Sequence, residues 1–131
     1  MYSIRAAVGF LVLSLALAAC TATGETSTAD PFASYDRVQS GVGDAALLTG
    51  TLVLDQGCLY ADSDGQRWLP VFPAAGTQWD ATAQTLTVDG RTAALGKTVE
   101  LGGGTAQAEI ITSAPEGCDR SQIWLVVSVG T

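Results

Sequence analysis

Short apolar runs that end in turn residues recur along this chain from about residue 48 onward. The runs are rich in aliphatic, aromatic and β-branched residues, which favour strands over helices. Asp64-Gly65 and Asp89-Gly90 each follow such a run, and Asp-Gly between two strands is typical of a tight hairpin. We therefore predict an all-β fold with strands at residues 48–54, 58–61, 68–72, 85–88, 98–101, 108–112 and 123–129.

The patterns within the runs indicate how the strands pack. Residues 85–88 alternate between polar and apolar, as a half-buried strand does, whereas residues 123–129 are nearly continuous in apolar character and indicate a central or closing strand. Pro70 and Pro73 predict that the strand at 68–72 is an edge, is bulged or ends there. Helix signals are weak, and only residues 92–95 could form a helical turn. The pattern favours a small barrel of about five to seven strands, with a small β-sandwich as the alternative.

The N-terminus has the three parts of an export signal. Arg5 supplies the positive charge, residues 6–17 are apolar, and small residues precede Cys20. Leu-Ala-Ala-Cys at residues 17–20 matches a lipobox, in which diacylglycerol is attached to the cysteine sulfur and the chain is then cut before that cysteine. An ordinary secretory signal and an uncleaved anchor are the alternatives, but the apolar run is shorter than the about 20 residues that a spanning helix needs.

These features predict three segments: a lipoprotein signal peptide at residues 1–19, a lipidated flexible tether at 20–44 and a barrel domain at 45–131. The tether segment is rich in Thr, Ala, Ser, Gly and Asp without apolar periodicity, as linkers are. Phe32 and Tyr35 are the side chains in it that could dock on the fold. Because two acyl chains anchor a protein stably, we expect the protein to be lipid-anchored at the extracytoplasmic face of the cell membrane.

The chain has three cysteines. If Cys20 carries lipid, Cys58 and Cys118 remain as an even pair in an oxidising compartment, which predicts a disulfide between them. Two free thiols or a metal pair are the alternatives. A closed zinc site needs four ligands, and the chain has no histidine, so we expect no metal and no cofactor.

Charge and composition exclude several functions. The chain has 6 basic and 13 acidic residues and a net charge of −7, which argues against binding nucleic acid or docking on anionic lipid through a basic patch. Without histidine, mechanisms of the Ser-His-Asp and Cys-His type are excluded. A pair of carboxylates could still hydrolyse a glycan, although acidic side chains next to glycines are more typical of exposed turns.

Aromatic side chains are the best candidates for ligand binding, because their faces can stack on sugars or contact a partner. In so small a domain most aromatic side chains must also build the core. Trp79 lies between two polar residues in a predicted loop and is the least typical of a core position. The candidate binding residues are Trp79, Trp68, Phe72 and Tyr60, with Trp124 as a further aromatic of the same kind.

Several motifs together resemble a known group. These are Gly-Cys-Leu at residues 57–59, Leu-Pro-Val-Phe-Pro at 69–73, Val-Glu-Leu-Gly-Gly-Gly at 99–104, Cys118, and Trp-Leu-Val at 124–126. From residue 50 to 129 the chain resembles small uncharacterised bacterial extracytoplasmic domains, often actinobacterial lipoproteins. The resemblance implies a five-stranded OB-like barrel in which the two cysteines pair, and it implies no activity. OB-like barrels often bind oligonucleotides or oligosaccharides, and the acidic charge argues against the first.

The sequence therefore predicts a monomeric, non-enzymatic binding module for an envelope protein or a cell-wall glycan. One alternative is a carrier of a small ligand, with a barrel pocket lined by Trp68 and Trp124. The other is a carboxylate-based glycan hydrolase, which requires two close carboxylates, one of them with a raised pKa.

Overall fold

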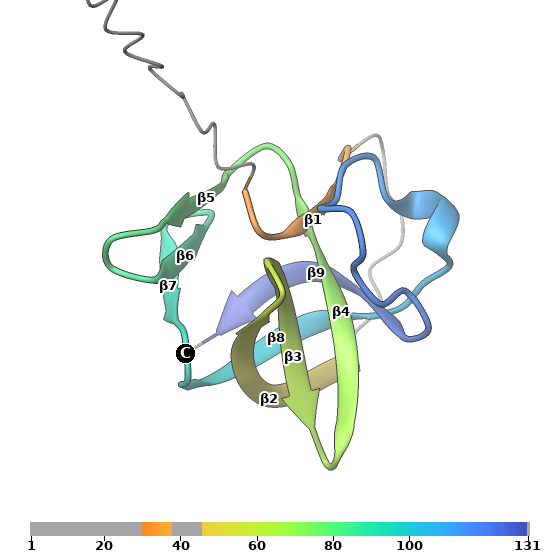
Figure 1. The fold of residues 1–131 in the computed structure, drawn as a ribbon, viewed down its shortest axis with the longest axis horizontal. Coiled ribbons are helices and arrows are strands. Elements are labelled where there is room, and N and C mark those ends of the chain that lie inside the picture. The colour runs from red at the N-terminus through yellow and green to blue at the C-terminus, as the bar shows by residue number, and fades with distance from the viewer. Residues whose placement is uncertain (1–29, 38–45, 131) are drawn as a thin grey trace, which may run out of the picture.

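A computed structural model describes residues 30–37 and 46–130 of the protein (Figure 1). The described part is all-β, and none of its helices is long and apolar enough to cross a membrane. A short 3-10 turn, η1, covers Ala108–Ile110. The strands are β1 (Ala33–Tyr35), β2 (Ala46–Asp55), β3 (Cys58–Ser63), β4 (Gln66–Pro73), β5 (Thr77–Asp80), β6 (Thr85–Val88), β7 (Arg91–Ala94), β8 (Thr98–Thr105) and β9 (Ile123–Gly130).

Five of these strands close into a ring, which confirms the predicted small barrel. Strand β2 pairs with β3 and β8, β3 pairs with β4, and β8 pairs with β9, all antiparallel. Strand β4 closes the ring by pairing with β9 in parallel. This order is OB-like, with two hairpin-connected strands following β2 and the last strand inserted in parallel beside β4. Strand β1 adds to β4, and β5, β6 and β7 form a separate small sheet beside the barrel (Figure 1).

The Asp-Gly pairs form the tight hairpins that the sequence predicts. Asp64 and Gly65 connect β3 to β4 with φ angles of 50° and 76°, and Asp89 and Gly90 connect β6 to β7 with 49° and 81°. Positive φ at both central residues defines the type I′ turn, whose twist matches that of paired strands. These local signals therefore fix two of the hairpins.

Two hydrophobic cores explain why some strands alternate and others are apolar throughout. One core fills the barrel and includes Leu59 of β3 together with Leu86 and Val88 of the small sheet. The other lies outside the barrel, where Cys58 and neighbouring side chains of β3, β4 and β9 meet β1 and the loop at residues 106–122. Strands β3, β4 and β9 are thus buried on both faces, which accounts for the continuous apolar run at 123–129.

Pro70 lies inside β4 rather than at an edge. On one side of this strand, β3 pairs as far as Trp68 and β1 begins to pair at Val71. Pro70 therefore falls at the change of partner, where its missing N–H interrupts no ladder. Pro73 ends the strand, as predicted.

Two local predictions are wrong. Residues 108–112 form η1 and the following loop instead of a strand, because Ala108 and Ile111 pack on the outer core and their apolar character reflects this contact. Residues 92–95 form most of β7 instead of a helical turn, since the Asp-Gly hairpin aligns this segment with β6.

Part of the predicted tether belongs to the fold. Within residues 20–44, the segment at 30–37 is described and contains β1, in which Ala33 and Tyr35 are buried. The Tyr35 hydroxyl donates a hydrogen bond to the Val126 carbonyl at 2.9 Å. Docking of Phe32 and Tyr35 therefore moves the start of the folded part from residue 45 to about residue 30, and Cys20 and the signal peptide lie outside the described residues.

Candidate functional site

The disulfide between Cys58 and Cys118 is present and ties the loop at 106–122 to β3. The two Cα atoms are 5.7 Å apart, and both side chains are buried. This confirms the pairing predicted from the cysteine count. It also leaves Cys20 as the third of the three cysteines of the chain.

Most of the candidate aromatic residues build the core. Phe72, Tyr60 and Trp124 are 1%, 5% and 6% exposed. Trp68 is half-buried and packs edge-to-face on Trp124, with ring centroids 5.7 Å apart. The Trp124 indole N–H donates to the carbonyl of Leu101 at 3.1 Å. Both tryptophans pack in the barrel core, and neither lines the pocket described below.

Trp79 lies in a strand, β5, and not in a loop. It pairs opposite Leu86, is half-buried and packs against the barrel core. The sequence did not indicate this strand because four residues are too few to show a clear alternation. Gln78 and Asp80, which flank Trp79, face solvent and are typical of a loop. Trp79 therefore contributes to the contact between the small sheet and the barrel.

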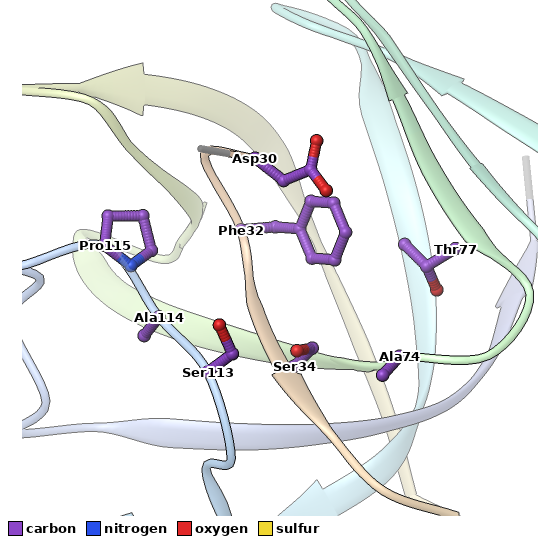
Figure 2. Close-up of a pocket in the computed structure, with 8 residues that line it drawn as sticks. All are labelled: Asp30, Phe32, Ser34, Ala74, Thr77, Ser113, Ala114 and Pro115. Atoms are coloured by element: carbon purple, nitrogen blue, oxygen red, sulfur yellow. The ribbon is translucent and has the colours of Figure 1, made fainter. Parts of the chain in front are cut away.

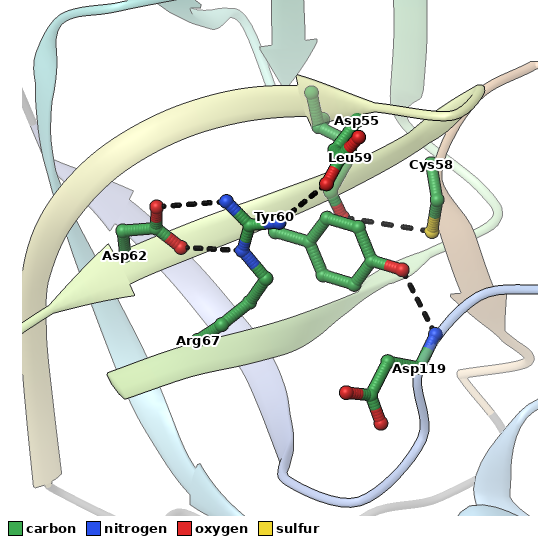
Figure 3. Close-up of polar contacts among 7 residues, drawn as sticks. All are labelled: Asp55, Cys58, Leu59, Tyr60, Asp62, Arg67 and Asp119. Carbon is green, nitrogen blue, oxygen red and sulfur yellow. Dashed lines mark hydrogen bonds and ion pairs between the residues drawn. The ribbon is translucent and has the colours of Figure 1, made fainter. Parts of the chain in front are cut away.

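Tyr60 and Arg67 form a polar cluster on the outside of the barrel (Figure 3). The Arg67 guanidinium lies 5.0 Å from the centre of the Tyr60 ring, and the Tyr60 hydroxyl accepts a hydrogen bond from the Asp119 N–H at 2.8 Å. Arg67 also donates to Asp62 at 2.8 Å and to Asp55 at 2.7 Å. The hydrogen bonds from Arg67 lower the pKa of the Asp62 carboxyl. A glycan hydrolase needs one carboxyl with a raised pKa, so Asp62 does not fit the role of that acid.

The loop at residues 106–122 covers the face that OB-like barrels use for ligands. In such barrels the second and third strands and two adjoining loops bind oligosaccharides or oligonucleotides. The corresponding strands here are β3 and β4, and their outer side chains Cys58, Tyr60 and Leu69 are buried beneath this loop. The disulfide and the hydrogen bond from the Asp119 N–H to the Tyr60 hydroxyl hold this loop against the barrel. Ligand binding by analogy with that face is therefore not supported.

A pocket of about 330 Å³ opens instead beside β1 (Figure 2). Three segments that are far apart in sequence form it: residues 30–34, the connection from β4 to β5, and the loop at 113–115. Hydrogen bonds hold these segments together, with the Ser34 N–H donating to the Ser113 carbonyl at 2.8 Å and the Ala74 N–H to the Tyr35 carbonyl at 2.9 Å. The lining residues are Asp30, Phe32, Ser34, Ala74, Thr77, Ser113, Ala114 and Pro115.

The polar groups of this pocket are hydroxyls and one carboxylate. Ser34 and Thr77 are buried, at 7% and 8% exposed, whereas Asp30 is exposed at the rim. Among the described residues, no group forms a hydrogen bond with the buried Thr77 Oγ1. None of the lining side chains is basic. The pocket thus suits a ligand that offers hydroxyl groups and carries no negative charge.

Sequence reasoning did not find this pocket. Its serines, threonine and aspartate are the residue types of ordinary turns, and they meet only because β1 pairs in parallel with β4 and bridges to Ser113. No spacing in the sequence brings these segments together. A signal existed only in Phe32, an aromatic residue in an otherwise linker-like segment.

The described residues contain no group of three or more His, Cys, Asp or Glu side chains that could hold a metal ion. We found no family model, curated protein or solved structure that matches this chain. The resemblance to bacterial extracytoplasmic domains therefore stays a prediction, and the function is argued from the chain itself.

Proposed function

We propose that this protein is a lipid-anchored binding module at the extracytoplasmic face of a cell membrane, with no catalytic role, that recognises an envelope partner. The lipobox at residues 17–20 supports the anchor. The observation that carries the proposal is the Cys58–Cys118 disulfide, because it implies an oxidising compartment and accounts for every cysteine except the one at the lipobox.

The position of the fold relative to the anchor supports binding close to the membrane. The described structure begins at Asp30, which lines the pocket, so only residues 21–29 separate the lipobox cysteine from the pocket. Ten fully extended residue steps span at most about 36 Å. Lipid on Cys20 would therefore hold the pocket within that distance of the bilayer surface, where envelope components are presented.

The pocket is the feature that supports binding as the role of the anchored domain. It is preformed by backbone hydrogen bonds, and it lies away from the covered outer face of β3 and β4. The rival hydrolase has less support, since Asp62, which shares Arg67 with Asp55, has a lowered pKa, whereas the acid of a hydrolase needs a raised one.

Metabolic labelling with a palmitate analogue in a bacterial host tests the anchor. The wild-type chain should incorporate the label and sediment with membranes, whereas Cys20→Ser should incorporate no label. The variant Cys58→Ser/Cys118→Ser controls for general effects of losing cysteines and should still be labelled. Equal label on Cys20→Ser and wild type, or no label on wild type, would contradict the proposal. Pull-down from detergent-solubilised envelopes then tests for a partner, and capture of neither a protein nor a glycan would contradict the binding role.

A further inference from the structure

We propose that the pocket beside β1 binds one neutral sugar unit, presented by a glycolipid headgroup or by a glycan strand. This inference rests on the proposed binding function and names the ligand class for it.

The lining chemistry selects against charged ligands. No lysine or arginine lines the pocket, and Asp30 lies at its rim, so an anion would meet a carboxylate without a compensating cation. A cation would find only one exposed carboxylate, and a lone ion pair in contact with water contributes little. The hydroxyls of Ser34 and Ser113 remain as the directional groups. Each both donates and accepts, as do the hydroxyls of a sugar.

Apolar groups complete a surface suited to a sugar ring. Phe32, Ala114 and Pro115 line the same pocket as the hydroxyls, and Figure 2 shows Phe32 between Asp30 and Thr77. A sugar ring presents C–H groups between its hydroxyls, so it matches walls in which apolar and hydroxyl groups alternate. A purely apolar ligand would leave the hydroxyls of Ser34 and Ser113 without partners.

The walls are held rigidly enough to select a ligand. Ser34 exchanges backbone hydrogen bonds with Ser113 at 2.8 Å and 3.3 Å, and Asp89 donates to the Gly76 carbonyl at 2.9 Å just before Thr77. A preformed site loses less conformational entropy on binding. A volume of about 330 Å³ lies at the lower end of the ~300–1,000 Å³ of small-molecule sites. One sugar unit therefore fits better than a longer chain.

Saturation-transfer NMR on the full chain in detergent tests the ligand class. The probes are the methyl glycosides of glucose, galactose, mannose and N-acetylglucosamine, with ethanolamine and methyl phosphate as charged comparisons. We expect saturation transfer to at least one glycoside and to neither charged compound. Transfer to none of the glycosides, or equal transfer to ethanolamine, would overturn the inference.

Two variants locate the binding, and one serves as a control. Ser113→Ala removes an exposed hydroxyl and should weaken the bound glycoside about 3- to 10-fold, the effect of one neutral hydrogen bond. Ala74→Trp fills the pocket from an exposed position and should abolish binding without lowering the urea midpoint of unfolding. Ser128→Ala removes an exposed serine on β9 outside the pocket and should bind as the wild type does. Equal affinity in all three variants would place any binding elsewhere.

The source of the sugar is distinguished by a vesicle assay. Phosphatidylcholine vesicles with and without a galactolipid are mixed with Cys20→Ser protein, which cannot insert through its own lipid. Flotation only with the galactolipid indicates a headgroup, whereas binding of soluble glycosides alone indicates a glycan strand. Both results support sugar binding. Absence of palmitate label from the wild-type chain would refute the anchor and leave this result unaffected, so the two proposals can fail separately.

Discussion

Removal of the Cys58–Cys118 disulfide should take away a large part of the stability of this domain. The bond joins residues 60 positions apart. For a closed loop of that length, the chain-entropy model gives about 4 kcal/mol of stabilisation from the restricted unfolded state. Folded domains are commonly stable by only about 5–15 kcal/mol, so Cys58→Ala/Cys118→Ala is expected to be folded but marginal at room temperature.

Equilibrium urea unfolding followed by tryptophan fluorescence measures this loss. At a slope of about 2 kcal/mol per molar urea, a loss of about 4 kcal/mol lowers the midpoint by about 2 M. Both cysteines are buried, so wild-type protein treated with mild reductant while folded should keep its midpoint. Wild-type protein reduced after unfolding should instead match the double variant.

The structure also predicts where the double variant loosens first. The loop at 106–122 is held to β3 by the disulfide and by the hydrogen bond from the Asp119 N–H to Tyr60. Hydrogen exchange at Asp119 and Ser113 should therefore accelerate more than exchange in β2 and β8. A midpoint shift worth less than about 1 kcal/mol, or uniform acceleration across the barrel, would refute the view that this bond stabilises the domain by restraining the unfolded chain and fastening the loop.

Three further changes test the packing and the charges. Tyr35→Phe removes the buried hydrogen bond to the Val126 carbonyl and should cost about 1 kcal/mol in urea unfolding; an unchanged midpoint would show that β1 is not fastened by it. Gly103→Ala places a methyl group against the backbone of β9, which should cost about 1–3 kcal/mol, and full stability would contradict the close approach. Arg67 lowers the pKa of Asp62 in the folded state below its ordinary value of 3.8. The stabilisation is therefore present above that pH and is lost as pH falls below it. The small stability difference between wild type and Arg67→Met should shrink on acidification, and a difference that grows would reverse the assigned sign.

Local signals in the sequence were enough to predict the strands of the barrel. The Asp-Gly turns fix two hairpins through backbone conformation alone, and the cysteine count predicts the disulfide without any knowledge of the fold. Strands β6 and β9 follow from patterns of burial within a few neighbouring residues. These features depend on short-range physics, which a single sequence carries.

Features that depend on pairing between distant segments were not predictable. Strand β1 has three residues and is stabilised by parallel pairing with β4, so it has no periodicity of its own. The apolar residues at 108–112 look like a strand because they are buried, but they are buried by the outside of the barrel. The pocket could not be predicted for the same reason, since Asp30, Thr77 and Ser113 are brought together only by tertiary contacts.

The covered face of the barrel follows from the size of the domain. A chain this short buries too little surface in a single barrel core to be very stable, and here a second core under the loop at 106–122 adds to it. That second core occupies the outer side of β3 and β4, the place where OB-like barrels bind ligands. The pocket for which we propose binding lies at a border of this loop, where β1 and residues 113–115 meet. If Cys20 carries lipid, as we propose, this border is also the part of the described fold nearest in sequence to the anchor.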